Sequence, residues 1–384
     1  PRTPCEVFPD RRIHGCASRF FGLEIPRGAR AGQRPAVLNG RIRKRIKRGG
    51  WSPTVFAASV TATTERAMDF TATKALFDLP DSVIYLDGNS LGMTPRRTVD
   101  AVRTVMEEQW AGDLISSWWD NGWLDLPLTV GDELAPVIGA RAGEVAVHDS
   151  TTVCLFQMVN VALDLAPGRR VIAVDPLEFP TDRYVAEGVA RLRESELVDD
   201  ITDVDNADVI VRSLVDYRTA ELQDLRGETE RANAAGATIV WDLSHAAGVV
   251  EVDLPAAGVE LAAGCTYKVL NGGPGAPAFT YLRRDIPDDV VQPIWGWFGQ
   301  TDQFAMDQPF DPREGIGRIL NGTPGVLGLT AAREGIRITA EAGIDAIAQK
   351  ARELSAFGRA VAEELELDAS GCLLYTSPSP RDAR

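Results

Sequence analysis

The feature that most constrains the fold of this chain is an alternation of short apolar runs with helical stretches between about Tyr85 and Gly328. Apolar runs of roughly four to eight residues are typical of buried strands, and helical patterns between them are typical of crossovers that connect parallel strands. The sequence therefore predicts an α/β domain with a mostly parallel central sheet and flanking helices.

The expected elements can be given by residue. Strands are expected at Glu144–His148, Arg170–Val174, Val209–Ser213, Ala237–Leu243, Ala262–Tyr267 and Ala278–Leu282. Helices are expected at Arg96–Gln109, Val153–Leu165, Asp182–Leu192, Glu221–Ala235, Leu329–Ala342 and Ile344–Leu367. No internal repeat is evident, so a repeat architecture is not expected.

Composition narrows the classes of protein to which the chain can belong. It has 384 residues, 45% of them hydrophobic, which is enough for one large domain and part of a second. No run of 18 or more apolar residues is present, so no membrane span is expected. The five cysteines show no CxxC spacing and there are only three histidines, so no metal site is expected. This cysteine pattern predicts a cytoplasmic protein.

Charge is distributed unevenly along the chain. Residues 1–50 carry 13 Lys or Arg and 3 Asp or Glu, whereas the rest of the chain carries 27 and 52. Because the main part of the chain is strongly acidic, nucleic acid is not an expected partner. The basic block Arg41-Ile-Arg-Lys-Arg-Ile-Lys-Arg48 has an alternative interpretation as a nucleic-acid or targeting patch.

Lysine is rare in this chain, and one lysine stands apart. Of the 40 basic residues five are Lys, and Lys268 is the only lysine between residues 75 and 349. It follows an apolar run in Cys265-Thr-Tyr-Lys-Val-Leu-Asn-Gly-Gly-Pro-Gly275. Because Lys, unlike Arg, can lose its proton and form an imine, Lys268 is a candidate Schiff-base lysine. The alternative is an ordinary surface lysine before a loop.

A carboxylate ends the strand that precedes this lysine. Thr238-Ile-Val-Trp-Asp-Leu-Ser-His245 predicts a buried strand that ends in Asp242 and His245, at the edge where α/β sheets bind ligands. An Asp placed 26 residues before a Schiff-base lysine can pair with the pyridinium nitrogen of pyridoxal phosphate (PLP) and keep the ring protonated. A turn or helix-capping aspartate is the alternative.

Two further segments complete such a cofactor site. His148-Asp-Ser-Thr-Thr152 ends a strand and opens a helix, where hydroxyls and free backbone N–H groups bind anions such as a phosphate. In Leu177-Glu-Phe-Pro-Thr-Asp182, Phe179 is placed to stack on the cofactor ring, with Asp182 near it. Taken alone, the first segment is a weak signal because Ser and Thr caps are common, and the second is better explained as a helix cap with a packed Phe.

Together these segments resemble the kynureninases. The matching stretches keep their order and spacing over roughly residues 80–335 and are Tyr85-Leu-Asp-Gly-Asn-Ser-Leu-Gly92, Ser117-Trp-Trp-Asp-Asn-Gly-Trp123, Asp149-Ser-Thr-Thr152, Phe179-Pro-Thr-Asp-Arg-Tyr184, Asp242-Leu-Ser-His-Ala-Ala-Gly248, the Tyr267-Lys268 loop, Gly296-Trp-Phe-Gly299 and Leu320-Asn-Gly-Thr-Pro324. The resemblance implies the PLP-dependent transferase-like fold (fold type I), PLP as cofactor, and an incomplete small C-terminal domain.

The resemblance also implies site residues and a homodimer. The implied cofactor-binding residues are Thr151, Thr152, Phe179, Pro180, Thr181, Asp182, Ser213, Asp242, His245, Tyr267, Lys268, Trp297 and Thr323, and the implied catalytic residues are Lys268, Tyr267 and Asp242. The two neighbouring threonines would hold the phosphate, and the two aspartates with His245 would surround the pyridine side. Trp297 and Thr323 would reach the phosphate of the neighbouring subunit, so a homodimer is expected.

The implied reaction is hydrolysis of a carbon–carbon bond in L-kynurenine, 3-hydroxykynurenine or both. The products are anthranilate or 3-hydroxyanthranilate and L-alanine, in tryptophan catabolism and NAD biosynthesis. Two alternatives stay open. Another lyase of this fold, such as a cysteine desulfurase, would use a cysteine beyond Lys268, where the chain has only Cys372. The other alternative is a non-catalytic PLP-binding fragment.

Both ends of the chain differ from its centre. Residues 1–67 are expected to be a basic leader that is disordered or non-native, and residues 370–384 a non-native tail. Residues 68–320 are expected to form the large PLP-binding domain, and residues 321–369 the start of a truncated small domain. In the family this small domain supplies an arginine for the substrate carboxylate, and no residue here matches it.

Overall fold

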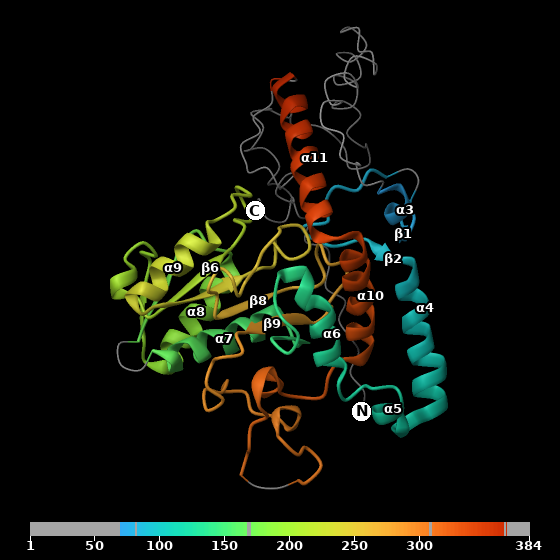
Figure 1. Cartoon of the computed structure of the whole chain (residues 1–384), viewed down its shortest axis with the longest axis horizontal. Coiled ribbons are helices and arrows are strands. Elements are labelled where there is room, and N and C mark those ends of the chain that lie inside the picture. The colour runs from blue at the N-terminus through green and yellow to red at the C-terminus, as the bar shows by residue number, and fades with distance from the viewer. Residues whose placement is uncertain (1–69, 81–82, 167–169, 307–308, 365, 367–384) are drawn as a thin grey trace, which may run out of the picture. The chain divides into compact units, whose positions relative to one another are not determined.

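The computed structural model describes residues 70–80, 83–166, 170–306, 309–364 and 366. Its centre is a seven-stranded sheet with the strand order β3-β9-β8-β7-β6-β4-β5 (Figure 1). The strands are β3 (Val145–His148), β4 (Val171–Val174), β5 (Glu196–Val198), β6 (Val209–Ser213), β7 (Thr238–Asp242), β8 (Leu261–Gly264) and β9 (Ala278–Leu282). The leader and tail expected at residues 1–67 and 370–384 lie outside the described residues.

Strand direction decides which ends of the strands meet. Strand β9 is antiparallel to both of its neighbours, β3 and β8, and the pairs from β8 to β5 are parallel. It follows that β3 points the same way as β4, β6, β7 and β8. Their carboxyl ends therefore lie along one edge of the sheet, which is where ligands bind in such sheets.

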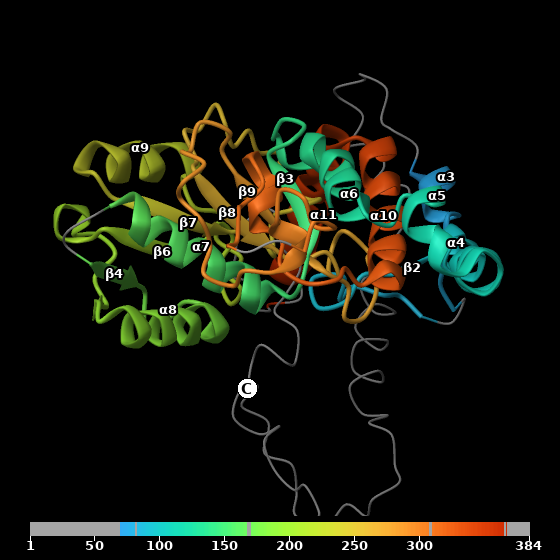
Figure 2. The same cartoon turned by 90° about the horizontal axis from the view of Figure 1, so that it is seen from below.

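Helices cover both faces of the sheet, which gives three layers (Figure 2). Helices α7 (Thr151–Leu165) and α8 (Pro180–Arg193) pack on one face, and α6 (Leu126–Leu134) and α9 (Leu225–Ala235) on the other. The strands supply alternate residues to the two faces: Val209 and Val211 of β6 join the core under α7 and α8, whereas Ile210 joins the other core. Because both faces are covered, the strands are mostly apolar.

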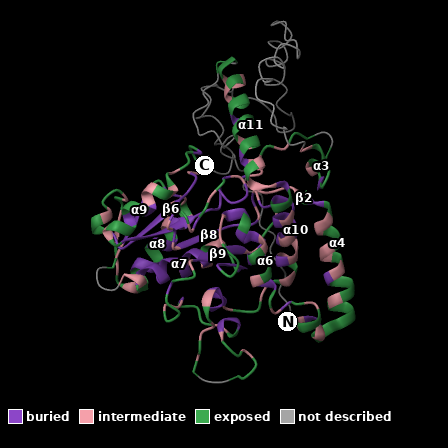
Figure 3. Ribbon diagram, viewed as in Figure 1, coloured by how far each residue is buried: buried purple, intermediate pink, exposed green. Residues whose placement is uncertain are grey.

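The other elements flank this core. They are α3 (Thr71–Lys74), β1 (Phe77–Asp78), β2 (Thr94–Pro95), α4 (Arg96–Thr104), α5 (Ser117–Asp120), α10 (Val326–Ala342) and α11 (Ile344–Glu364), with a π-helix at Val105–Asp113 and 3₁₀ turns at Leu114–Ser116, Ala135–Ile138, Val204–Asn206, Trp297–Gly299 and Gly315–Ile319. Helix α10 packs against α4 and α6, while α11 is largely exposed (Figure 3). Within the described ranges, no helix is both long and apolar enough to span a membrane.

The expected α/β architecture is confirmed, and most expected elements are present. Strands β6 and β9 have the expected bounds, whereas β8 ends at Gly264 instead of Tyr267. The helix expected at Arg96–Gln109 is α-helical only to Thr104 and continues as the π-helix. Strand β5 and helix α6 were not expected. The division into domains at residue 320 stays a prediction, and Leu329, Ala332 and Ile336 of α10 belong to the same core as α6.

Candidate functional site

The candidate site is built around Lys268, in the loop that follows β8. Lys268 is 7% exposed, and its Nζ lies 2.5 Å from Nε2 of His245, in the loop that follows β7. Burial, together with the positive charge of Lys268, lowers the pKa of His245 to about 3. His245 is therefore neutral at neutral pH, and its Nε2 accepts a hydrogen bond from the Lys268 amine.

Two buried aspartates lie beside this pair. Asp242 is the last residue of β7, and its Oδ1 accepts a hydrogen bond from the backbone N–H of Ser244 at 2.8 Å. Asp182 lies in the first turn of α8, and its buried Oδ2 has no hydrogen-bond partner among the described residues. Burial raises the pKa of both carboxyl groups, and the pKa of Asp182 is raised further by the charge of Asp242. The site thus holds two buried carboxyl groups side by side, of which Asp182 retains its proton more readily than an ordinary aspartate.

Aromatic rings border the lysine on two sides. The Lys268 Nζ lies 5.6 Å from the ring centroid of Phe179 and 5.8 Å from that of Tyr267. Phe179 directly precedes α8, and the backbone carbonyl of Tyr267 accepts the N–H of Gly92 at 2.9 Å. Ser213, the last residue of β6, lies opposite Asp242 in the parallel register. These expected site residues therefore come together at the carboxyl edge of the sheet.

The expected phosphate-binding threonines begin a helix at the same edge. Thr151 and Thr152 are the first two residues of α7, and the side chain of Ser150 caps the helix by accepting the N–H of Val153 at 3.4 Å. Helix α7 follows β3, whose carboxyl end lies on the same edge as that of β7. The positive end of the helix dipole and the free N–H groups of its first turn suit an anion.

The remaining four expected site residues are Pro180, Thr181, Trp297 and Thr323. Pro180 and Thr181 form the start of α8 directly after Phe179. The Trp297 Nε1–H donates to Thr323 Oγ1 at 3.2 Å, and between these two segments Asn321 Nδ2 donates to Oδ2 of Asp149, two residues before Thr151, at 3.1 Å. Their expected role toward a neighbouring subunit stays a prediction.

The N-terminal segment closes on the lysine loop through one glycine. A Cβ atom on Gly92 would lie 2.3 Å from the carbonyl oxygen of Lys268, and this distance is too short for any residue with a side chain. The neighbouring Met93 N–H donates to Oδ1 of Asn271 at 2.9 Å. Gly92 is the last residue of the matching stretch that starts at Tyr85, and close backbone approach explains why glycine is required there.

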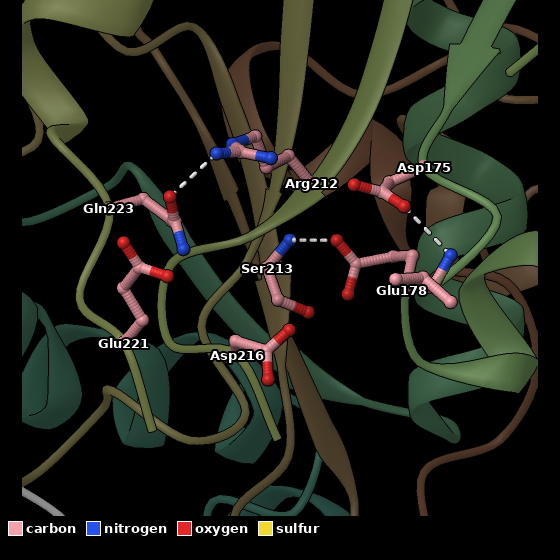
Figure 4. A pocket seen from close by; sticks show the side chains of 8 residues that line it. Asp175, Glu178, Arg212, Ser213, Asp216, Glu221 and Gln223 are labelled. Atoms are coloured by element: carbon pink, nitrogen blue, oxygen red, sulfur yellow. Dashed lines mark hydrogen bonds between the residues drawn. The ribbon is translucent and has the colours of Figure 1, made fainter. Parts of the chain in front are cut away.

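Sequence reasoning missed Glu178, which is buried next to the site. Glu178 lines a cavity of about 280 Å³ whose other walls are Asp175, Leu177, Arg212, Ser213, Asp216, Glu221 and Gln223 (Figure 4). Lys268 is not part of this cavity, so the cavity adjoins the site without being its centre. The described residues contain no group of three or more His, Cys, Asp or Glu side chains that could hold a metal ion.

Comparison with known proteins supplies the family. No protein-family model matches the chain. It is 41% identical to the kynureninase of Pseudomonas fluorescens over 293 residues, which are 73% of this chain and 70% of that protein. It is 44% identical over 294 residues to the kynureninase of Deinococcus radiodurans, with 73% and 72% covered. The chain belongs to the kynureninase family. The expected resemblance is therefore confirmed.

Solved structures confirm the fold class. The cysteine desulfurase of Thermococcus onnurineus NA1, in its apo form, matches with a TM-score of 0.67 and 20% identity, over 81% of this chain and 80% of that one. A mutant of C-DES with glycine covalently linked to its PLP cofactor matches with a TM-score of 0.65 and 15% identity, over 79% and 83%. At such identities the likeness concerns the fold alone, which is that of the fold-type I enzymes.

Proposed function

We propose that this member of the kynureninase family is a PLP-dependent hydrolase that converts L-kynurenine, its 3-hydroxy form or both to the aminobenzoate and L-alanine. The observation that carries the proposal is the buried Lys268 amine beside Asp242 and Asp182, at the carboxyl edge of the sheet. A lysine and a carboxylate at adjacent strand ends are the groups that PLP chemistry requires. The relatives named kynureninase support the substrate.

The residues present fit the cofactor. Asp242, at the end of β7, would accept a hydrogen bond from the protonated pyridine nitrogen, and the buried Asp182 carboxyl, whose Oδ2 has no hydrogen-bond partner in the described part of the chain, lies beside it. Phe179 borders the Lys268 amine and would cover one face of the ring. The first turn of α7, with Thr151 and Thr152, would hold the phosphate. When bound, PLP supplies an electron sink for the electrons left at the substrate α-carbon.

Proton transfers fall to the two adjacent residues of the lysine loop. Lys268 would hold the cofactor covalently and, once released by substrate, would take the proton from the substrate α-carbon. His245 is neutral and accepts a hydrogen bond from Nζ, so it orients the lysine without adding a second positive charge. Tyr267, whose ring lies 5.8 Å from Nζ, would protonate the three-carbon fragment that leaves as alanine. Water supplies the hydroxyl of the new carboxylic acid.

The proposed active unit is a homodimer in which each site takes residues from both subunits. Trp297 and Thr323 form a hydrogen-bonded pair next to Asn321, whose side chain donates to Asp149 at the start of α7 of its own chain. The Trp297 side chain is 37% exposed, so a second copy can reach it. In this arrangement the pair would approach the phosphate bound at α7 of the other subunit.

The test compares two lysine variants. Lys268→Ala should abolish borohydride-dependent attachment of PLP, measured by peptide mass spectrometry, and should abolish anthranilate production from kynurenine. The exposed Lys350→Ala variant is the matched control and should keep both properties. Attachment of PLP to a lysine other than Lys268 would refute the site, whereas PLP attachment at Lys268 without hydrolysis of either kynurenine would refute the substrate.

A further inference from the structure

Strand β4 ends before its neighbour β6 does, and the side chain of Glu178 takes the hydrogen-bonding position that β4 leaves open. The last register pair between β4 and β6 is Val174 with Val211, whereas β6 continues to Ser213. On the other side of β6, the next residue, Leu214, donates its N–H to the backbone carbonyl of Asp242 at 2.9 Å. The Ser213 N–H therefore points toward the side that β4 has left, and it donates to Oε2 of Glu178 at 2.9 Å (Figure 4).

The second oxygen of the same carboxylate holds the ring-stacking residue. Oε1 of Glu178 accepts the backbone N–H of Phe179 at 2.8 Å, and Glu178 is only 8% exposed. One buried carboxylate thus joins the backbone of Phe179 to the end of β6. Both donors are main-chain groups that would lose their partner if the carboxylate were removed, and an unpaired buried N–H is costly.

Other contacts hold this loop through side chains and through the start of α8. The Phe179 ring packs edge-to-face on Tyr217, with centroids 5.1 Å apart, and Arg218 Nη2 donates to the carbonyl of Leu177 at 2.7 Å. The Phe179 carbonyl accepts the backbone N–H groups of Asp182 and Arg183 at 2.9 and 3.3 Å, which fixes the carbonyl side of this residue to α8. Glu178 holds the N–H side of Phe179 and, through its other oxygen, the Ser213 N–H, so this carboxylate links the aromatic residue to the strand end beside Asp242.

We propose that Glu178 is a positioning residue, which holds Phe179 against the cofactor ring through its two backbone hydrogen bonds. The proposal rests on the proposed function, because it assumes that PLP binds at Lys268. Glu178 does not touch the reacting atoms in this scheme; it acts through Phe179. Its negative charge has a second consequence, since it raises the pKa of Asp182 after the larger effects of burial and of Asp242.

The experiment compares Glu178→Ala and Glu178→Gln with Glu221→Ala. Glu221 lines the same cavity but is exposed, so its variant controls for loss of a carboxylate there. Gln keeps one acceptor oxygen and loses the other, so the PLP affinity of Glu178→Gln should lie between that of wild type and that of Glu178→Ala. We expect Glu178→Ala to raise the PLP dissociation constant by about tenfold and Glu178→Gln by less. Both should weaken the circular dichroism that the bound PLP acquires, because that signal depends on how rigidly the ring is held.

Each outcome decides between the interpretations. A PLP affinity and circular dichroism equal to those of wild type in both Glu178 variants would overturn the proposal. If Glu178→Ala does not fold, the folded Glu178→Gln variant decides by the same two measurements. Because neither measurement needs turnover, a wild-type protein that binds PLP but does not hydrolyse kynurenine would refute the proposed function and leave the role of Glu178 to be judged separately. Addition of kynurenine to active variants should show a lower kcat with little change in KM.

Discussion

At the scale of single residues, the site is crowded with buried acids. Glu178, Asp182 and Asp242 are all less than a tenth exposed, and burial raises the pKa of each. Lys268 is the cation that lowers the pKa of the two aspartates, since His245 is neutral. Such crowding opposes folding in the cofactor-free protein, and it is typical of a site selected for chemistry instead of stability.

Asp242→Asn should therefore change stability and activity in opposite directions. Asn keeps an oxygen for the Ser244 N–H but removes the buried charge. Because the folded-state pKa of Asp242 is raised, wild type loses stability relative to the variant as the pH increases from about 4 through that pKa. We expect the free energy of unfolding of the cofactor-free variant to exceed that of wild type by about 1 kcal/mol at pH 8, and by less at pH 5.

Turnover should respond in the other direction. Without a negative partner for the pyridine nitrogen, kynurenine hydrolysis by Asp242→Asn should fall on the order of a hundredfold. Urea unfolding at both pH values and anthranilate release are the measurements. A variant that is less stable than wild type at pH 8, or that keeps wild-type turnover, would show that Asp242 does not have this role.

At the scale of elements, the strands and helices that could be predicted from the sequence are those whose bounds follow from local hydrophobic pattern. Strands β6 and β9 are mostly apolar, and both were predicted to the residue. Strand β5 was missed because it has only three residues, Glu196–Val198, at the edge of the sheet. Helix α6 was missed because Pro127 and Gly131 interrupt its pattern, although tertiary packing against β3 holds it in a helix.

The same distinction applies to the site. Lys268 and Asp242 could be found in the sequence because one is chemically rare in this chain and the other ends an apolar strand. Glu178 could not be found this way, although it directly precedes Phe179. Its partner, the Ser213 N–H, is free only because β4 ends before β6 does, and that mismatch belongs to the assembled sheet.

Two helical glycines provide a test of how α10 supports the lysine loop. A Cβ on Gly335 of α10 would lie 2.1 Å from the carbonyl oxygen of Leu270, two residues after Lys268, whereas a Cβ on Gly188 of α8 would meet nothing within 4 Å. Gly188→Ala should raise the free energy of unfolding by up to about 1 kcal/mol, through helix propensity. Gly335→Ala should lower it by about 2 kcal/mol, because backbone must move.

Gly335→Ala should also displace the loop that carries Lys268. We expect weaker PLP attachment in this variant and unchanged attachment in Gly188→Ala, measured by absorbance during titration with PLP. Urea unfolding curves give the stabilities. Equal stability and equal PLP attachment in the two variants would mean that α10 does not set the position of the loop.

At the scale of the whole molecule, exposed aromatic residues gather near the Trp297 and Thr323 pair. Trp119 and Phe304 are 58% and 46% exposed, and the Phe304 ring lies 5.7 Å from that of Trp119 and 6.0 Å from that of Trp297. Exposed aromatic clusters of this kind mark interfaces. The cluster therefore supports the proposed homodimer, in which Trp297 serves the site of the other subunit.

If each active site takes residues from both subunits, two variants that are inactive alone should regain activity when they form mixed dimers. Lys268→Ala lacks the lysine, and Trp297→Ala lacks the residue that would serve the neighbouring site. When equal amounts are unfolded and refolded together, half of the dimers should be mixed, and each mixed dimer should contain one intact site. Activity should therefore return to about a quarter of the wild-type value, whereas each variant alone stays low.

The matched control is a mixture of Lys268→Ala with Asp242→Asn, which damage the same half of the site and should not restore activity. Sedimentation analysis of differently tagged chains should verify that mixed dimers form in both mixtures. If mixed dimers of the first pair form and stay inactive, Trp297 serves its own chain, and the proposed sharing of sites is wrong.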